Sequence, residues 1–579
     1  MRIHKPVSIY LLCVVILAFV LRFWHLGTNP VGFHRDEAFL GYNAYSILKT
    51  GRDMSGNAFP VHLQSFFWSP AGYSYASIPF IAVFGLNEFS SRFASALFGS
   101  LSVIATFFLV SFLLRTEIHP RDPTQKIAKG IAYSDSVSLI ASFVIAVSPW
   151  HVNASRIGIE ITLVVFLITV ACVLFFLYIR SKHIALFIGT FILFALSFTV
   201  YQAPRAFVPL LIPLLFFLYR QYVSRKHLLF AGLLYVAVIL LPIGYVMTSP
   251  VLSLRLQSLS VFNSPQAQLK IDEAIREDGM NRRPAIAARV LHNKAVGYAN
   301  EILNNYVSHF SFDFLFRDKG FPTRMTIFGS GNMHMVELLF LLLGLYIIVS
   351  RRSRYHILVG LWILAAPVGS SLTYDDVPNM QRTLLIQPAL SIAVSFGIWE
   401  LVSRMREKKY LAVPVMIFAF IYVFNMAQYL DAYYVHQPTQ GAQFRNAGYK
   451  ELVSEVEKIR NQHTRVVVTN AESAPTVFFL FYTAYDPSRY QLESKHTDKE
   501  KSDSINFANF SFESDDCPLN TRLGMKKGMP YEPRQLSGTD SASLYVQFRD
   551  CEVASRSSEL IGSVRLPNGQ EVFQILKTK

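Results

Sequence analysis

Two adjacent carboxylates, Asp36 and Glu37, stand in a polar stretch that begins after the first long apolar run of the chain. Carboxylates in such a stretch can move protons or hold a divalent cation through their oxygens. The residues that follow, Phe39, Tyr42 and Tyr45, have helical spacing, which predicts a short helix along a membrane interface. Because a helix dipole favours acids at its N-terminus, the alternative is that Asp36 is only an N-cap.

Three arginines and another acid stand in later polar loops. Arg156, Arg205 and Arg382 each have an aromatic or proline neighbour, and Arg382 closes the polar stretch 375–382. Guanidinium groups bind phosphate, but an arginine at a lipid interface is often only a headgroup anchor, so both interpretations stay open. Glu160 follows Ser155-Arg156, either as part of a site or as an interfacial carboxylate paired with Arg156. His34 is a secondary candidate.

The elements that position these residues must be membrane helices. Of the 579 residues, 52% are hydrophobic and only 16% are charged, whereas about 25% are charged in a soluble domain. Most apolar residues fall in runs long enough to cross the ~30 Å hydrocarbon core as helices. This excludes a single soluble enzyme and a disordered scaffold, and it argues against an outer-membrane barrel, whose strands alternate in polarity. The predicted fold class is a polytopic α-helical membrane protein with about eleven spans plus interfacial helices.

The hydropathy pattern places these spans near residues 7–24, 91–114, 136–149, 160–179, 183–200, 206–220, 228–246, 336–350, 357–373, 383–401 and 410–430. The first span has the outline of a signal peptide, but Phe23-Trp24-His25 is not a small-residue cleavage site, so it is expected to stay.

The net charge of +15 does not indicate nucleic-acid binding, because the basic residues cluster in short loops between spans. With the N-terminus in the cytoplasm, the inner segments hold 18 lysines and arginines and the outer short loops hold six. Cytoplasmic loops carry such an excess. Residues 25–90, 247–335 and 431–579 are therefore expected outside, in a multi-pass protein of the cell membrane.

Residues 1–430 are expected to form a transmembrane catalytic domain and residues 431–579 an extracytoplasmic α/β domain. In the latter, 447–459 and 475–485 read as helices, 465–469 and 544–548 as strands, and Pro567-Asn568-Gly569 as a hairpin turn. Cys517 and Cys551 lie in a compartment that permits a disulfide, but two cysteines leave the pairing open.

The predicted spans carry no charged residue in their interiors. Transporters usually need charged or strongly polar groups near the midplane, whereas here the polar residues stand in outer loops. An enzyme working at the outer interface fits this distribution. A lipid or polysaccharide transporter is the alternative, and a non-catalytic surface-assembly scaffold is a third hypothesis.

The chain resembles the protein O-mannosyltransferase group of GT-C glycosyltransferases in the order of its motifs. The bacterial relatives of this group include the enzymes that add aminoarabinose to lipid A. The resemblance covers roughly residues 1–430. It is carried by Asp36-Glu37, Ala44–Asp53 (AYSILKTGRD), Ser69-Pro70, Tyr73–Tyr75 (YSY), Phe84–Arg92 (FGLNEFSSR), Ser148–His151 (SPWH), Ser155–Glu160 and Tyr201–Arg205 (YQAPR).

The resemblance implies transfer of a sugar, with inversion, from a polyprenyl-phosphate donor to an acceptor hydroxyl on a protein, lipid or glycan. It implies Asp36 as the general base, Glu37 as an orienting group and Glu160 as a second acid. Arginines, namely Arg156, Arg205 and Arg382, would stabilise the leaving phosphate. No cofactor or metal is expected to be required, although Asp36, Glu37 and Glu160 could hold a divalent cation.

The long outer region 247–335 contains the aromatic segment 310–316 and the glycines Gly329 and Gly331. Loops of this length are often lids, and we expect this one to cover the donor, with Lys319 or Arg324 near the phosphate. The alternative is a fixed interfacial helix pair that only packs against the outer domain.

The topology gives the first prediction. A cysteine replacing Ser353 should resist a membrane-impermeant thiol reagent in intact cells, because 351–354 is an inner segment. A cysteine introduced within 431–579 should react under the same conditions. Labelling of position 353 in intact cells would overturn the arrangement.

Overall fold

Apolar runs become helices here because a backbone in lipid must satisfy its own hydrogen bonds. The computed structural model describes residues 5–65, 67–117, 125–248, 259–281, 284–405, 412–470, 474–495, 505–523, 542–553 and 557–578. Contacts divide the chain into two compact units. The helical unit comprises Met1–Trp24, Ser95–Ser155 and Glu160–Leu430, and the mixed unit comprises His25–Ala94, Arg156–Ile159 and Asp431–Lys579.

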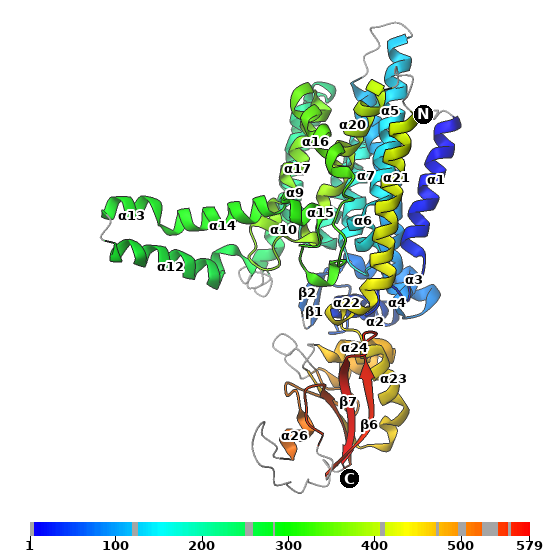
Figure 1. The fold of residues 1–579 in the computed structure, drawn as a ribbon, viewed down its shortest axis with the longest axis vertical. Helices are drawn as coiled ribbons and strands as arrows, with labels where there is room; N and C mark the ends of the chain where they lie inside the picture. The colour runs from blue at the N-terminus through cyan, green and yellow to red at the C-terminus, as the bar shows by residue number, and fades with distance from the viewer. Residues whose placement is uncertain are drawn as a thin grey trace. The chain divides into compact units, whose positions relative to one another are not determined.

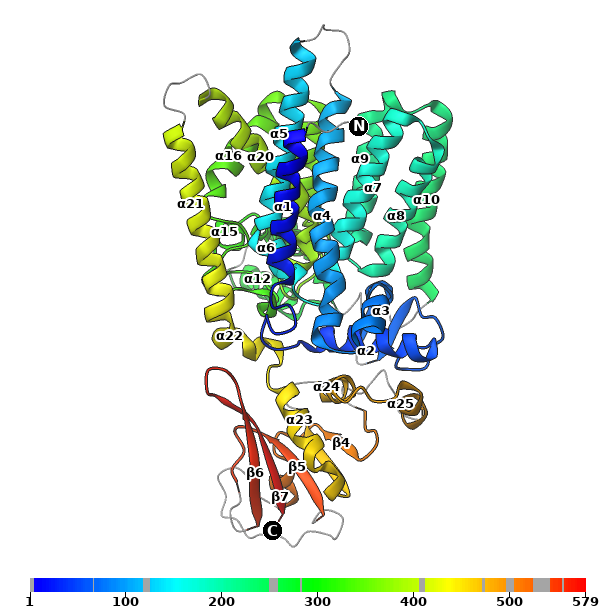
Figure 2. The same cartoon turned by 90° about the vertical axis from the view of Figure 1, so that its right-hand side faces the viewer.

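Long helices lie side by side in the helical unit (Figures 1 and 2). They are α1 (Lys5–Phe23), α5 (Gln125–Val147), α7 (Ile161–Ser181), α8 (Ile184–Val200), α9 (Pro204–Tyr219), α10 (Arg225–Thr248), α16 (Glu337–Arg351), α17 (Arg354–Ala365), α20 (Gln387–Met405) and α21 (Ala412–Asp431), together with α4 (Glu88–Thr116), which begins in the mixed unit. Shorter helices are α6 (Pro149–Ser155), α12 (Pro265–Met280), α13 (Ala285–Leu291), α14 (Lys294–Ser308), α15 (Phe312–Phe316), α18 (Val368–Ser371) and α19 (Met380–Thr383).

A helix overlaps each of the eleven predicted spans, but fewer are long and apolar enough to cross a membrane. Within the described residues these are Glu88–Thr116, Ile161–Ser181, Met380–Met405 and Val413–Gln440, and a fifth if the pair Ala132–Val147 and Pro149–Ser155, bent by 58°, is one span. The break falls at Pro149, which has no N–H to donate to the preceding turn. A polytopic helical membrane protein is confirmed, and the number eleven stays a prediction.

Close helix packing in the helical unit depends on small residues. A side chain at Gly344 of α16 would meet the carbonyl oxygen of Ala393, and one at Gly397 of α20 would meet that of Phe340. Glycine at both positions lets the two backbones approach, as is typical of membrane helix pairs.

The mixed unit is built around a five-stranded sheet of order β4-β3-β5-β7-β6. Its strands are β3 (Arg465–Thr469), β4 (Phe510–Glu513), β5 (Ser543–Phe548), β6 (Ser558–Arg565) and β7 (Glu571–Thr578). β3 pairs parallel with both neighbours, and β7 pairs antiparallel with β5 and β6. The unit's other elements are α2 (Arg35–Thr50), β1 (His62–Ser65), β2 (Phe67–Pro70), α3 (Gly72–Phe84), α22 (Gln437–Gln440), α23 (Tyr449–Ile459), α24 (Pro475–Tyr482), α25 (Pro487–Glu493) and α26 (Pro518–Arg522).

The helices predicted near 447–459 and 475–485, the strands at 465–469 and 544–548 and the hairpin turn are confirmed, although α24 ends at Tyr482. The buried run RVVVT is β3, the helix near 475 is α24, and Pro567–Gly569 turns the chain between β6 and β7. Cys517 and Cys551, whose pairing the sequence leaves open, form a disulfide. The mixed unit also includes residues 25–94, which the predicted division at residue 430 assigns to the transmembrane domain.

Part of the predicted topology lies outside the described residues. This holds for residues 249–258 and 282–283 of the long outer region, for the start of the last span at 410–411, and for the inner-segment cations Arg2, Arg121, Arg406, Lys408 and Lys409.

Candidate functional site

Helix α2 begins with a capping box in which the two adjacent acids have different functions. His34 is the N-cap and its side chain accepts from the Asp36 N–H, while the Glu37 carboxylate accepts from the His34 N–H at 3.2 Å. Such boxes satisfy backbone donors that a helix start leaves unpaired. The alternative that Asp36 is the N-cap is therefore wrong, and Glu37 takes the capping function.

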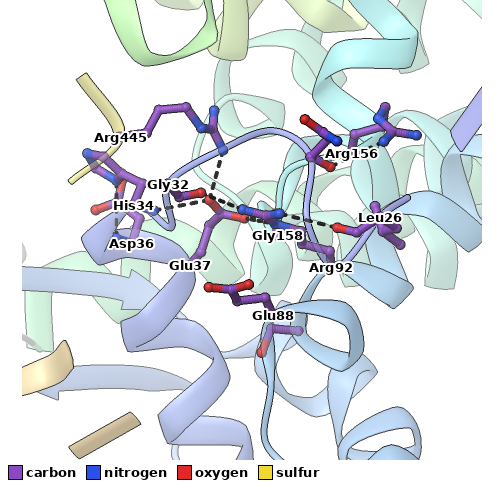
Figure 3. A network of polar contacts seen from close by, with 12 residues as sticks. Leu26, Gly32, His34, Asp36, Glu37, Glu88, Arg92, Arg156, Gly158 and Arg445 are labelled. Carbon is purple, nitrogen blue, oxygen red and sulfur yellow. Dashed lines mark hydrogen bonds and ion pairs between the residues drawn. The ribbon is translucent and has the colours of Figure 1, made fainter. Parts of the chain in front are cut away.

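The Glu37 carboxylate is the centre of a buried ionic cluster in the mixed unit (Figure 3). Its Oε1 accepts from Arg92 Nε at 2.9 Å and from the Gly158 N–H at 2.8 Å, and its Oε2 accepts from Arg445 at 2.9 Å. All three side chains are at most 1% exposed. We call Glu37, Arg92 and Arg445 the Glu37 cluster.

The same arginine fixes the loop that precedes α2. Arg92 donates to the Leu26 carbonyl at 3.2 Å and to the Gly32 carbonyl at 2.7 Å. Gly32 has φ +84°, and a Cβ there would lie 2.8 Å from atoms of Arg445, so only glycine fits. The cluster therefore holds the start of α2 against α4 and residue 445.

Opposing effects act on the pKa of the Glu37 carboxyl. Burial raises it, but the charges of Arg92 and Arg445 and the hydrogen bonds from Arg92 and Gly158 lower it more, so the pKa lies below the usual 4.5. Glu37 is thus held as a carboxylate and is poorly suited to accept a proton.

Asp36 has a different environment although it is the adjacent residue. Its side chain is 29% exposed, with Oδ2 3.4 Å from His34 Nδ1 and Oδ1 4.0 Å from Arg35 Nε. Asp36 is therefore the exposed member of the pair, whereas the Glu37 side chain is 0% exposed.

Arg156, a predicted phosphate ligand, is fully buried in the mixed unit. It donates to the Tyr433 hydroxyl at 2.9 Å and to the Asn29 carbonyl at 3.2 Å, and it lies over the rings of Tyr433 and Tyr434 at 5.1 and 5.5 Å. These contacts match a structural cation–π site rather than an exposed headgroup anchor.

The helical unit contains a cavity of about 570 Å³. Arg205 and Arg382, the two other predicted phosphate-binding residues, line this cavity. Most of its wall is apolar, including Pro209, Ile239 and Leu259. Such a lining, with a few charged groups, is typical of a site for an amphiphilic ligand.

The loop that carries Arg382 is tied down by several contacts. Arg382 donates to Thr373 Oγ1 at 2.7 Å and pairs with Asp375 at 3.1 Å. His309 accepts from the Asn379 N–H at 3.1 Å, and its Nδ1 lies 2.7 Å from the Asn305 carbonyl. Burial, the largest effect, lowers the pKa of His309 to about 4, so this link is made by a neutral imidazole.

Gln381 of the same loop contacts two more residues of the predicted site, Glu160 and Arg324. The Gln381 amide donates to Glu160 Oε2 at 3.2 Å and accepts from Arg324 at 3.5 Å. Glu160 is 6% exposed at the start of α7. Lys319, by contrast, is exposed, and no described contact places it in the same group.

No group of three or more histidine, cysteine, aspartate or glutamate side chains is arranged to hold a metal ion within the described residues. Both oxygens of Glu37 already accept from guanidinium and backbone donors.

Sequence reasoning missed most partners of the predicted residues. Arg92 could have been found, because it is a charged residue at the edge of an apolar run and ends the motif 84–92. Gln381 stands beside Arg382 in the polar stretch 375–382. Arg445 and His309 have no comparable signal in the sequence.

Comparisons with known proteins identify the fold. The structure of ArnT from Cupriavidus metallidurans bound to undecaprenyl phosphate is similar over 99% of this chain and 98% of that one, with 11% sequence identity and a TM-score of 0.52. The same protein in the apo state gives a TM-score of 0.51 at 11% identity, covering 99% and 98% of the two chains. The oligosaccharyltransferase AglB from Archaeoglobus fulgidus, at 14% identity, matches with a TM-score of 0.48 over 83% of this chain and 63% of that one.

Neither a protein-family profile nor a curated protein sequence matches the chain. The likeness to ArnT therefore rests on structure, and it confirms the GT-C fold that the sequence motifs resemble.

The burial of Glu37 predicts a specific loss of stability. Glu37→Gln would leave two buried guanidinium ions without a counter-charge, which costs about 3–5 kcal/mol. Chemical unfolding of the purified protein in detergent should show this loss. Asp36→Asn, the matched change at the neighbouring position, should stay within about 0.5 kcal/mol of wild type. Equal stability of the two variants would contradict the electrostatic assignment.

The same cluster predicts how stability depends on pH. Because folding lowers the Glu37 pKa, its contribution is complete above the unfolded value of 4.5 and is lost as the pH falls through the lower folded value. Melting temperatures measured from pH 7 to pH 3 should fall more steeply for wild type than for Glu37→Gln. Parallel curves would show that Glu37 does not titrate in this way.

Proposed function

We propose that the protein is an inverting glycosyltransferase that takes a sugar from a polyprenyl-phosphate donor and transfers it to a hydroxyl on the outer face of the membrane. The observation that carries the proposal is the cavity of the helical unit, which combines a mostly apolar wall with Arg205 and Arg382. A polyprenyl phosphate has the same combination of a long apolar chain and an anionic head.

The fold supports this assignment. ArnT, which shares the fold over nearly the whole chain, was solved with undecaprenyl phosphate bound. We assign the isoprenoid chain of the donor to the apolar wall and its phosphate to the two arginines.

The proposed reaction is a single displacement. The Asp36 carboxylate takes the proton of the acceptor hydroxyl, and the hydroxyl oxygen bonds to the anomeric carbon of the sugar. The bond from that carbon to the phosphate oxygen breaks, and polyprenyl phosphate leaves with the electron pair. Arg205 and Arg382 stabilise the charge on the departing phosphate.

The remaining residues have supporting roles in the proposal. Glu37 orients Asp36 by fixing the first turn of α2, and Arg156 holds the residue 156–159 segment through its tyrosines. Glu160 and Arg324, which Gln381 joins, form a second polar group near the Arg382 loop. Lys319 belongs to the loop proposed to cover the donor. No metal is required for these steps.

Loss of the base should abolish transfer without unfolding the protein. For Asp36→Asn we expect a rate lower by about 10²- to 10⁴-fold, because general-base catalysis contributes that factor. Mass spectrometry of surface glycans and lipids can compare a deletion strain complemented with wild type or the variant. Glu455→Gln removes another exposed carboxylate and should complement fully. Full complementation by Asp36→Asn would show that Asp36 is not the base.

The arginines should recognise the phosphate and not the isoprenoid chain. For Arg382→Gln or Arg205→Gln we expect undecaprenyl phosphate to bind about 10- to 100-fold more weakly, because a hydrogen bond to a charged group contributes about 1.5–3 kcal/mol. Undecaprenol, which lacks the phosphate, should bind all variants alike. Arg489→Gln, an exposed arginine of the mixed unit, is the control. Unchanged affinity for undecaprenyl phosphate in both variants would remove the cavity from the donor site.

A further inference from the structure

The helices α12, α13 and α14 form a hairpin that projects from the helical unit, crosswise to α16 and α17 (Figure 1). Its helices have their own caps, since Ser264 accepts from the Ala267 N–H at 3.2 Å and Asn293 from the Val296 N–H at 3.0 Å. A Cβ at Gly297 would lie 2.3 Å from Ile271, so α12 and α14 cross closely. The hairpin is therefore a built element and not an irregular loop.

The hairpin exposes an unusual amount of apolar surface. In α13, Ile286 is 80% and Val290 62% exposed, and in α14 Leu303 and Val307 are 57% and 56% exposed. Each pair is spaced i, i+4, so its members share a helix face. α14 has no buried residue.

Charge is distributed unequally between the two layers of the hairpin. α12 has six charged residues among sixteen, whereas α14 has two among fifteen. In Figure 1, α13 and α14 lie on the side of the hairpin toward the inner ends of α16 and α17, and α12 lies on the other side. The two layers therefore differ in charge, although Leu269 and Met280 of α12 are also exposed, at 69% and 75%.

The base of the hairpin is continuous with the lipid-facing surface of the spans. Tyr306 donates to the carbonyl of Leu364 on α17 at 2.7 Å, and Asn305 donates to the Thr373 carbonyl at 3.1 Å. Leu361 and Leu364 nearby are 41% and 50% exposed. A bilayer that covers these leucines extends to α14 at the same level.

We propose that the α12–α14 hairpin lies flat in the outer leaflet, with the exposed residues of α13 and α14 among the acyl chains and the charged residues of α12 in water. Helices with one apolar face bind at this depth. Exposed Arg289, in the last turn of α13, and exposed Lys294, the first residue of α14, extend their charged ends to the phosphates of the headgroups. The hairpin is thereby a lipid-binding surface beside the spans.

The test measures depth in a bilayer directly. The full-length protein, with Cys13 and Cys172 replaced by alanine, receives one new cysteine at Ile286, Leu303 or Glu273 and a fluorescent label. Reconstituted in nanodiscs, labels at 286 and 303 should be quenched several-fold more strongly by lipids carrying a nitroxide on the acyl chain than by aqueous iodide. The label at 273, on α12, should show the reverse order.

Two outcomes would overturn the proposal. Iodide quenching at 286 and 303 as strong as at 273 would place the hairpin in water. Protection from both quenchers, with cross-links between copies, would mean that a second copy of the chain covers this face. A double variant tests whether the apolar side chains hold the hairpin in the bilayer. Ile286→Glu with Leu303→Glu should make a label at Val290 accessible to iodide while the spans stay folded.

Discussion

A carboxylate without access to water must be matched by charge from the protein, and this constraint organises the mixed unit. Glu37 meets it with two guanidinium groups and two backbone N–H groups. These donors come from four segments, which include residues 92, 158 and 445. Since a buried charge tolerates little displacement of its partners, the cluster fixes all four segments at once. The first turn of α2, and with it Asp36, is held as a consequence.

The helical unit combines closely packed helices with a cavity. α16 and α20 approach closely at Gly344 and Gly397, whereas the region that includes Arg205 and Arg382 leaves a cavity. The Arg382 loop is held by neutral His309 and by Thr373. The proposed donor site requires this combination, in which close helix packing and a tethered polar loop leave a cavity open.

Elements that follow a repeating sequence pattern could be predicted. Single ion-pair partners that lie far apart in the sequence could not. Apolar runs predicted the helices, RVVVT predicted β3, and the polar stretch at the start of α2 pointed to Asp36 and Glu37. Periodicity and local composition are sufficient for such predictions. Arg445 lies 408 positions from Glu37, in a segment without periodicity, and an ion pair has no required spacing. The capping function of Glu37 was not predicted, because His34 rather than Asp36 is the N-cap of α2. The hairpin α12–α14 has ordinary amphipathic helices, but its projection depends on tertiary contacts at Tyr306 and Gly297.

The burial of the partner carboxylate separates arginines that hold the fold from arginines that can bind a ligand. Arg92 and Arg445 pair with a carboxylate that is 0% exposed, so exchanging Glu37 for a substrate phosphate would require the whole cluster to open. Arg382 pairs with Asp375, whose side chain is 36% exposed. Water screens that pair and reduces its strength, so the Arg382–Asp375 pair costs less to separate than the Glu37 cluster. The proposal that Arg382 binds the donor phosphate while Arg92 and Arg445 hold the fold therefore rests on how far water reaches the partner carboxylate of each arginine.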